Sequence, residues 1–188
     1  MSDAVPLTGE PLALDLVNTR TAAGDLLAAP GDLHAWLLLQ ADRLPDPGPL
    51  DMHVVCAVHA VRKHAANALE RARCGERPAA ADLAALNDAQ RAAPAITELT
   101  WDGTAVTAAR RRTGPPGARL AGRLAEAAAD LLADPSVTRI RQCEAGDCVL
   151  LFLPAHPRRR WCSAARCGNR ARVARHYQRR KGPGVSGA

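Results

Sequence analysis

CEAGDC, at residues 143–148, and CSAARC, at residues 162–167, place four cysteines in the last quarter of the chain. Two thiolate pairs, each closed by a short loop, can both reach one tetrahedral ion, which is how structural Zn²⁺ is bound. Four thiolates leave no open position for water, so we expect one structural zinc ion and not a catalytic one. The expected ligands are Cys143, Cys148, Cys162 and Cys167. A redox or disulfide role is the alternative.

The start of the chain favours the metal. Residues 1–20 hold no basic segment followed by an apolar one, as a secretory signal would, and no run approaches the roughly eighteen apolar residues of a membrane span. We therefore expect a cytoplasmic, nucleoid-associated protein without a membrane partner. In reducing cytosol, spaced cysteine pairs are more often metal ligands than disulfides.

Charge is distributed unevenly along the chain. Residues 139–181 carry twelve Arg and Lys against two acidic residues, which is +10, so a chain of net charge +6 has −4 elsewhere. A zinc tetrathiolate returns about two negative charges to this segment. A basic module on a mildly acidic body suits a polyanion such as DNA. A solvated basic surface is the alternative.

The N-terminal part has mainly helical patterns. Apolar spacing, capping residues and Pro or Gly breaks predict four helices and one hairpin joined by Asp102-Gly103, a dipeptide that tolerates positive φ angles. Residues 12–17 fit either a strand or a helix. The predicted helices cover residues 32–43, 50–73, 78–89 and 118–133, and the hairpin strands cover 96–101 and 104–110.

The C-terminal pattern predicts a zinc module. We expect a strand at residues 137–142 that delivers Cys143, a hairpin with arms at 149–153 and 159–161, and a helix capped by Ser163. This order is treble-clef-like. The fold class is therefore α+β: a mostly helical N-terminal domain with a small β-hairpin (1–136), a treble-clef-like zinc finger with four cysteine ligands (137–181) and a flexible tail (182–188).

The last helix should have two faces. One side, formed by Cys167, Ala171, Ala174 and Gln178, would cover the metal and the hairpin. The other side presents arginines whose planar groups match phosphate or the edge of guanine. Trp161 fits a miniature core better than a base-stacking site. The candidate DNA contacts are Arg158, Arg159, Arg160, Asn169, Arg170, Arg172, Arg175 and Arg179.

The CGNR sequence at 167–170, with WCS at 161–163 and the first cysteine pair, resembles the bacterial CGNR zinc-finger family. LALDLVNT at 12–19, followed by Asp25 and Trp36, resembles the start of the ABATE domain that precedes this finger. The resemblance implies a stress-induced transcriptional regulator, and the four cysteines as its metal ligands. Gly168 would permit close packing, while Asn169 and Arg170 could bond either to the zinc loops or to a partner.

Three functions compete. The leading one is a DNA-binding regulator whose N-terminal domain senses a small-molecule effector or mediates assembly, with a dimer expected because one small finger reads few bases. The second is an adaptor that binds an acidic protein. An enzyme is disfavoured, because no catalytic pattern is present. His53, Cys56, His59 and His64 could at most form a second metal or catalytic group. A ligand pocket would be lined by Asp15, Asn18, Arg20 and Trp36.

Overall fold

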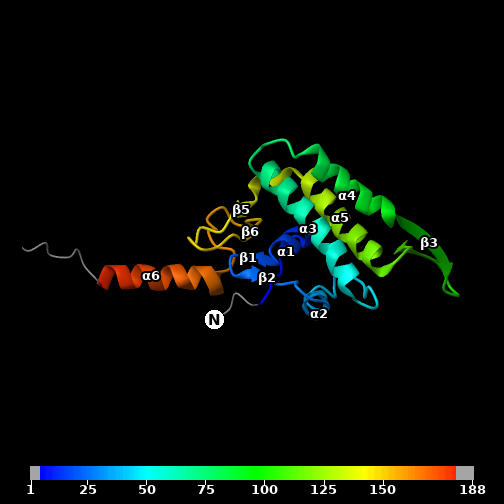
Figure 1. The fold of residues 1–188 in the computed structure, drawn as a ribbon, viewed down its shortest axis with the longest axis horizontal. Helices are drawn as coiled ribbons and strands as arrows, with labels where there is room; N and C mark the ends of the chain where they lie inside the picture. The colour runs from blue at the N-terminus through cyan, green and yellow to red at the C-terminus, as the bar shows by residue number, and fades with distance from the viewer. Residues whose placement is uncertain (1–4, 181–188) are drawn as a thin grey trace, which may run out of the picture.

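Three long helices form the centre of the computed structural model, which describes residues 5–180 (Figure 1). They are α3 (Met52–Arg73), α4 (Ala80–Ala92) and α5 (Pro116–Ala133), and all three pack against one another. The elements before them are α1 (Leu12–Val17), β1 (Arg20–Thr21), β2 (Gly24–Asp25) and α2 (Pro30–Leu38). A mostly helical N-terminal domain followed by a four-cysteine cluster confirms the predicted α+β class. Within residues 5–180, no helix combines the length and hydropathy that crossing a membrane requires.

The two ends of α3 follow from its sequence. At the start, the Asp51 carboxylate accepts a hydrogen bond from the backbone N–H of Val54 at 2.9 Å, which satisfies one of the free donors of the first turn. At the end, Gly75 adopts φ +74°, and its N–H bonds to Ala72 O at 3.0 Å. The N–H of Glu76 then bonds back to Arg71 O at 2.9 Å, which completes a Schellman motif.

Small residues on α5 allow the bundle to pack tightly. Leu120 and Leu124 are buried on this helix, as the predicted apolar stripe requires. A Cβ atom at Gly122 would lie 3.2 Å from the carbonyl oxygens of both Ala89 and Ala93, closer than most side chains allow. A larger residue at position 122 would therefore push α4 away from α5.

The segment that could have been a strand or a helix is helical. In α1, Leu14 and Leu16 are both fully buried and belong to the main hydrophobic core. Periodicity over six residues could not decide between the two forms. Packing against α3 and α5 is available only in the folded domain, and it is this contact that α1 makes.

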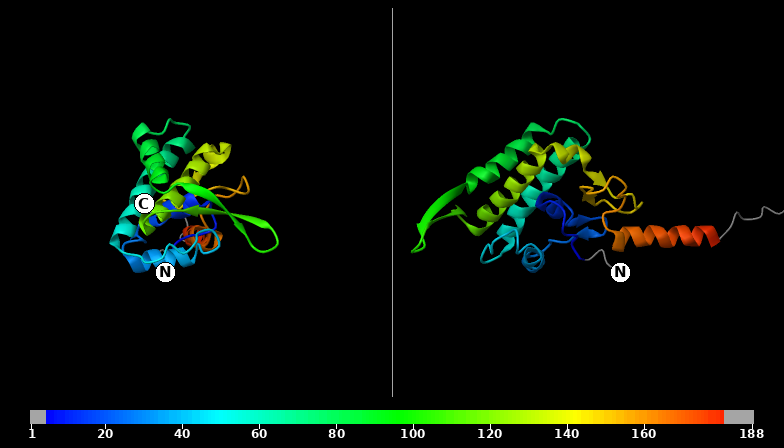
Figure 2. Two further views of the ribbon diagram at one scale, coloured as in Figure 1. Left: turned by 90° about the vertical axis from the view of Figure 1, so that its right-hand side faces the viewer. Right: turned by 180° about the vertical axis from the view of Figure 1, so that it is seen from behind.

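The predicted hairpin is confirmed as β3 (Ala95–Trp101) and β4 (Val106–Arg112), which pair in antiparallel register. Its connection is longer than a two-residue turn, because four residues lie between the strands. The Asp102 carboxylate accepts hydrogen bonds from the N–H groups of Thr104 and Ala105, both at 2.9 Å, and closes this loop. The hairpin extends beyond the end of the bundle (Figures 1 and 2).

The strand pairing in the finger differs from the prediction. Residues Pro135–Arg139 form a 3₁₀ helix, not the start of a strand, because Pro135 fits a first helical position and Asp134 caps the turn. The strand that delivers Cys143 is only β5 (Arg141–Gln142). It pairs with β6 (Leu151–Phe152), whereas residues 159–161 form no strand. The predicted hairpin between the cysteine pairs is therefore wrong.

The other edge of β6 explains this pairing. The side chain of Asn18 bonds to both the N–H and the carbonyl oxygen of Leu151, each at 2.8 Å. Glu10 accepts a hydrogen bond from the N–H of Leu153 at 2.9 Å. Side chains from the N-terminal segment thus occupy the positions that a further strand would need.

The chain ends in α6 (Asn169–Arg180), which follows a π-helical turn at Ala164–Gly168. Ser163 caps the turn as predicted, accepting a hydrogen bond from Arg166 N at 3.4 Å. The expectation that one side of this helix covers the metal and the hairpin is wrong beyond the first turn. The helix projects away from the rest of the molecule (Figure 1), and Val173 and Tyr177 are 53% and 62% exposed. The predicted tail, residues 182–188, lies outside the described residues.

Candidate metal centre and nucleic-acid interface

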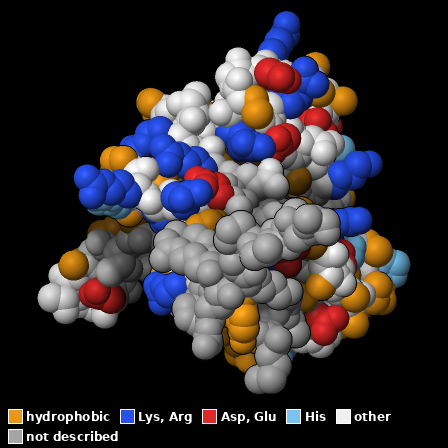
Figure 3. Space-filling view, turned by 90° about the vertical axis from the view of Figure 1, so that its left-hand side faces the viewer, with side chains coloured by type: hydrophobic (Ala, Val, Ile, Leu, Met, Phe, Trp, Pro, Cys, Tyr) orange, Lys and Arg blue, Asp and Glu red, His pale blue; other side chains and the backbone are white. Residues whose placement is uncertain are grey.

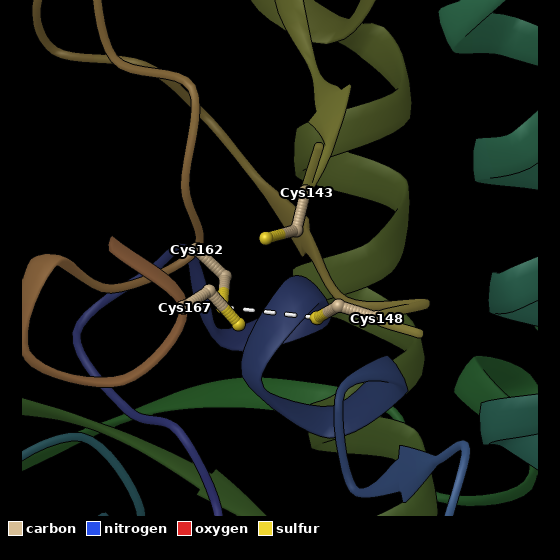
Figure 4. A group of neighbouring side chains, drawn as sticks. All are labelled: Cys143, Cys148, Cys162 and Cys167. Carbon is tan, nitrogen blue, oxygen red and sulfur yellow. Dashed lines mark hydrogen bonds between the residues drawn. The ribbon is translucent and has the colours of Figure 1, made fainter. Parts of the chain in front are cut away.

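The four predicted cysteine ligands converge on one point (Figure 4). Their sulfur atoms all lie within 4.8 Å of one another, with Cys148 and Cys162 at 3.9 Å and Cys162 and Cys167 at 3.5 Å. A tetrahedral zinc ion with Zn–S bonds of about 2.3 Å requires sulfurs about 3.8 Å apart. The cluster therefore has the spacing of a four-thiolate zinc site.

The electrostatics of the cluster also call for a cation. Burial and the charge of neighbouring sulfurs raise the pKa of Cys148 to about 12, and burial likewise raises the pKa of Cys162. Burial opposes ionisation of Cys143 as well, but N–H groups of Ala145 and Cys162 outweigh it and lower the pKa of that thiol. Four thiolates in this space need a compensating positive charge, which Zn²⁺ supplies. The donor set fits one structural zinc ion.

The loops that carry the cysteines are held by backbone hydrogen bonds. Cys143 N bonds to Leu150 O, and Cys148 N bonds to Ala145 O, both at 2.9 Å. These bonds shape the first loop so that its two sulfurs face the same point. In the second loop, Gly168 N bonds to Ser163 O at 3.0 Å, which sets the position of Cys167.

The residues after Cys167 serve the zinc loops. A Cβ atom at Gly168 would lie 3.2 Å from the Trp161 ring, so this glycine permits the close packing that was predicted. Trp161 is half-buried against the cysteine cluster, in agreement with a role in the small core. Arg170 donates to Cys167 Sγ at 3.1 Å and pairs with Asp147 at 2.9 Å. Arg170 therefore bonds to both zinc loops in this structure.

The three arginines before the second pair differ in their surroundings. Arg159 lies over the Phe152 ring at 4.4 Å and pairs with Glu10 at 2.6 Å, so its guanidinium group joins the finger to the N-terminal segment. Arg160 pairs with Glu144 at 2.5 Å and lies 5.2 Å from the Trp161 ring centre. Arg158 is exposed, with its backbone N–H bonded to His156.

The remaining candidate contacts lie on α6. Asn169 donates to Ala165 O at 3.1 Å and accepts from Arg172 at the same distance, and both residues are exposed. The side chains of Arg175 and Arg179 lie outside the described part of the structure. Seen from the end where α6 projects, the surface carries Lys and Arg side chains with a few acidic groups among them (Figure 3).

The structure does not bring the proposed ligand-binding set to a common pocket. Asp15 is fully buried and accepts hydrogen bonds from the N–H groups of Gly9 and Glu10 at 3.0 Å, while Gln40 and Arg43 also contact its carboxylate. The remaining three members lie apart. Trp36 is buried in the main core, Asn18 holds β6, and Arg20 is exposed at a separate cleft with Asp25 and His59.

Two of the three histidines of α3 have partners outside any second metal cluster, and the third, His53, is exposed. His59 Nε2 lies 2.8 Å from Leu27 O, and His64 Nδ1 lies 2.8 Å from the Asp82 carboxylate. Among the described residues, the four finger cysteines are the group of His, Cys, Asp and Glu able to hold a metal ion. Cys56 and Cys74 are exposed and lie apart from it.

Sequence reasoning missed the contacts between the two halves of the chain. Asn18 reaches Leu151 in β6, and Glu10 reaches Arg159 and the residue just after β6, Leu153, across 133 to 149 residues of sequence. No local spacing signals such a contact. The available signal was the presence of polar residues, Glu10 and Asn18, on either side of an apolar segment.

We expect Asn18→Ala to destabilise the contact between the two halves. The substitution removes two hydrogen bonds of 2.8 Å and leaves the buried N–H and carbonyl of Leu151 without these partners. The expected loss is about 3 kcal/mol, measured by denaturant unfolding of the zinc-loaded protein. Asn87→Ala, at an exposed site on α4, is the control and should change little. Equal effects of the two variants would contradict this role.

Two family models match the chain. Residues 10–135 match ABATE, described as "Putative stress-induced transcription regulator", and residues 139–180 match the CGNR zinc finger. Neither model describes an enzyme. No curated protein sequence matches the chain. The ABATE match covers more than half of the sequence, and the four converging cysteines lie within the second match, so the chain belongs to the ABATE family and carries a CGNR zinc finger after its ABATE domain.

Proposed function

We propose that this protein is a DNA-binding transcription regulator whose zinc finger and basic C-terminal helix contact the nucleic acid. The family supplies the regulatory role in general terms. The observation that carries the DNA-binding part is the excess of arginine on the finger. Zinc would hold this small module in one shape, because it is too short to fold on a hydrophobic core alone.

The finger keeps most of its positive charge after its internal ion pairs are counted. The two acidic residues, Glu144 and Asp147, already pair with Arg160 and Arg170. In the described structure, no carboxylate lies within ion-pair distance of five other finger arginines. These are Arg139, Arg141, Arg158, Arg166 and Arg172. Guanidinium groups that lack a carboxylate match the phosphates of DNA, which would supply the missing negative charge.

The geometry of α6 supports the same proposal. A helix of 12 residues that projects from the molecule can enter the major groove, which accommodates one α-helix. Arg172, Arg175 and Arg179 would then face DNA from the helix, while Arg158 would contact the backbone from the loop. Asn169 and Arg170 contribute by shaping the start of the helix, and Arg159 and Arg160 by positioning the second cysteine pair.

Removing phosphate contacts should lower both affinity and salt dependence. With five or six contacts, we expect a log-log slope of about −5 for the wild-type protein. Arg158→Ala/Arg172→Ala should bring the slope about two closer to zero, since each contact contributes about 0.9. Fluorescence anisotropy with duplex DNA over a salt series measures this. The control is Arg77→Ala/Arg91→Ala, which removes the same charge from two exposed sites, one in the loop before α4 and one in its last turn.

Two results would favour binding of an acidic protein over binding of DNA. The first is an affinity for DNA that stays constant across the salt series. The second is failure of the zinc-loaded protein to enrich any site from sheared genomic DNA, together with a pull-down that survives nuclease treatment. Equal effects of the finger variant and its charge-matched control would show that only net charge matters.

The N-terminal domain would sense an effector or mediate assembly. Its hairpin exposes Ile96, Leu99, Trp101 and Val106, each between 47% and 68% exposed. Dimer formation stays a prediction, based on the few base pairs that one finger can read.

A further inference from the structure

A cleft rich in arginine lies where β4 returns to the helical bundle, at the base of the hairpin. Its volume is about 640 Å³, within the range of about 300–1,000 Å³ that is usual for small-molecule sites. Four segments contribute to it: the loop after α2, the start of β3, the end of β4 and the first turns of α5. The arginines that line it are Arg110, Arg111, Arg112, Arg119 and Arg123.

One carboxylate inside this group faces three of the arginines. Glu126 lies 2.8 Å from Arg110, 2.8 Å from Arg112 and 3.7 Å from Arg123. Burial opposes ionisation of Glu126, but Arg112, with help from the other two, outweighs it and lowers the pKa of the carboxyl. The single negative charge of Glu126 is therefore shared by three arginines and neutralises only one of their three positive charges.

Another arginine of the cleft is held by neutral groups. Arg119 donates to Gly114 O at 3.2 Å and to Pro47 O at 2.9 Å. Carbonyl oxygens orient the guanidinium plane without cancelling its charge. Asp46 lines the same cleft, but its carboxylate accepts a hydrogen bond from Gly48 N at 2.8 Å and forms no ion pair within the described residues.

The local charge stays positive when the acids that pair with these arginines or line the cleft are counted. Arg111 pairs with Glu98 at 3.0 Å, so the five arginines face Glu98, Glu126 and Asp46, which leaves +2. This positive excess lies in the N-terminal part of the chain. The residues outside 139–181 have a net charge of −4, so the charge of the cleft is opposite to that of its surroundings. Five of the thirteen basic residues outside residues 139–181 thus line this one cleft.

A purely structural role accounts for one of these arginines. Arg112 is 10% exposed and donates to both Glu126 and Ala93 O, which fastens β4 to the bundle. Arg110 and Arg123 remain 60% and 40% exposed beside the same carboxylate. Arg112 alone is enough to attach the hairpin through Glu126. The exposed ion pairs that Arg110 and Arg123 form with the same carboxylate contribute little to stability.

The other walls of the cleft are apolar. Leu44, Pro45, Pro47, Ala95 and Leu120 line it together with the arginines. A site with an apolar wall and a few convergent polar groups fixes a ligand by its charged end and accommodates a less polar remainder. Guanidinium forks bind phosphate oxygens two at a time, and a phosphate monoester carries about two negative charges at neutral pH.

We propose that this cleft binds a small molecule bearing a phosphate group, held by Arg110, Arg119 and Arg123 against the apolar wall. The net charge of the cleft matches that of one phosphate monoester. Binding there would connect the loop after α2, the hairpin and α5, and would give the N-terminal domain an effector site. The site does not depend on DNA binding by the finger, which lies in a different part of the chain.

Calorimetry on the zinc-loaded full chain tests the proposal with defined probes. Pyrophosphate and ATP should bind, whereas adenosine, which lacks phosphate, should not, and citrate should bind more weakly than ATP. Arg110→Gln/Arg123→Gln should weaken ATP binding by about tenfold or more, because it removes two charge-assisted contacts. The exposed pair Arg77→Gln/Arg91→Gln is the charge-matched control and should bind ATP as the wild type does.

A second variant distinguishes a loss of ATP binding from a loss of folded structure. Arg119→Lys keeps the charge but loses the planar fork, so it should fold, as circular dichroism can verify, and still bind ATP several-fold more weakly. Absence of ATP and pyrophosphate binding at millimolar concentration would overturn the proposal, as would equal losses in the control. If duplex DNA binding, and not ATP binding, depended on Arg110 and Arg123, the cleft would be part of a nucleic-acid surface, which would also overturn it. Failure of the finger to bind DNA would leave the calorimetric result unchanged.

Discussion

Replacing Cys162 by serine should abolish stoichiometric zinc binding and unfold the finger. The sulfur of Cys162 is buried and lies 3.5 Å from Cys167 and 3.9 Å from Cys148, and among the described residues only the other three cysteines join it as possible ligands of this cluster. Structural zinc contributes about 10–16 kcal/mol to the folding of such modules, far more than any other contact in the finger. We expect zinc content to fall from about one ion per chain to nearly none after dialysis.

The readouts should separate the finger from the helical domain. In Cys162→Ser, protease should cut within residues 139–180, while most of the helical signal in circular dichroism, which α3, α4 and α5 supply, should remain. Cys74→Ser, at an exposed site at the end of α3, is the matched control and should keep its zinc. Full zinc retention by Cys162→Ser would contradict the four-thiolate site.

Asp15→Ala should destabilise the N-terminal domain by about 3–5 kcal/mol, because it removes a fully buried carboxylate and leaves half-buried Arg43 and two backbone N–H groups without that partner. Asp15 is fully buried and joins Arg43, Gln40 and the backbone N–H groups of Gly9 and Glu10. Losing it would also release the segment that carries Glu10, which reaches Leu153 and Arg159 in the finger. Thermal and denaturant unfolding measure the change.

An exposed carboxylate provides the comparison. Asp88 pairs with Arg91 at 2.7 Å, but both side chains are 72% exposed, so Asp88→Ala should cost less than about 1 kcal/mol. Similar losses for Asp15→Ala and Asp88→Ala would contradict the structural role. An Asp15→Asn variant that kept its stability but lost a response to an effector would favour the ligand-binding role instead.

Elements whose signals are local were predicted well. The limits of α3 follow from Asp51 and Gly75, and the β3–β4 hairpin follows from Asp102-Gly103 and its flanking apolar residues. The strand expected at residues 137–142 was largely wrong, because Pro135 and the Asp134 cap favour a 3₁₀ turn over extended backbone. The choice between a strand and a 3₁₀ turn at these residues was also local. It followed from the Asp134 cap and not from the alternation of side chains.

The functional residues show the same division. Convergence of the four cysteines was predictable, because two short loops and a cysteine count specify a metal site without knowledge of the rest of the fold. The roles of the arginines were not. Arg159 and Arg170 have the same residue type as Arg158, yet they bond to Glu10 and to Cys167, respectively, and only the positions of those partners separate them.

By itself, the sequence determined the zinc site, the three long helices of the bundle and the family, because each depends on spacing within a few residues or on a short signature. The tertiary structure alone decided how β6 is paired, where Asp15 and Asn18 act and which arginines share a cleft. These features join segments that lie far apart in the chain, such as Asn18 and Leu151, or Pro47 and Arg119. Such contacts leave no periodic signal, since they arise only when packing of the helices brings the segments together.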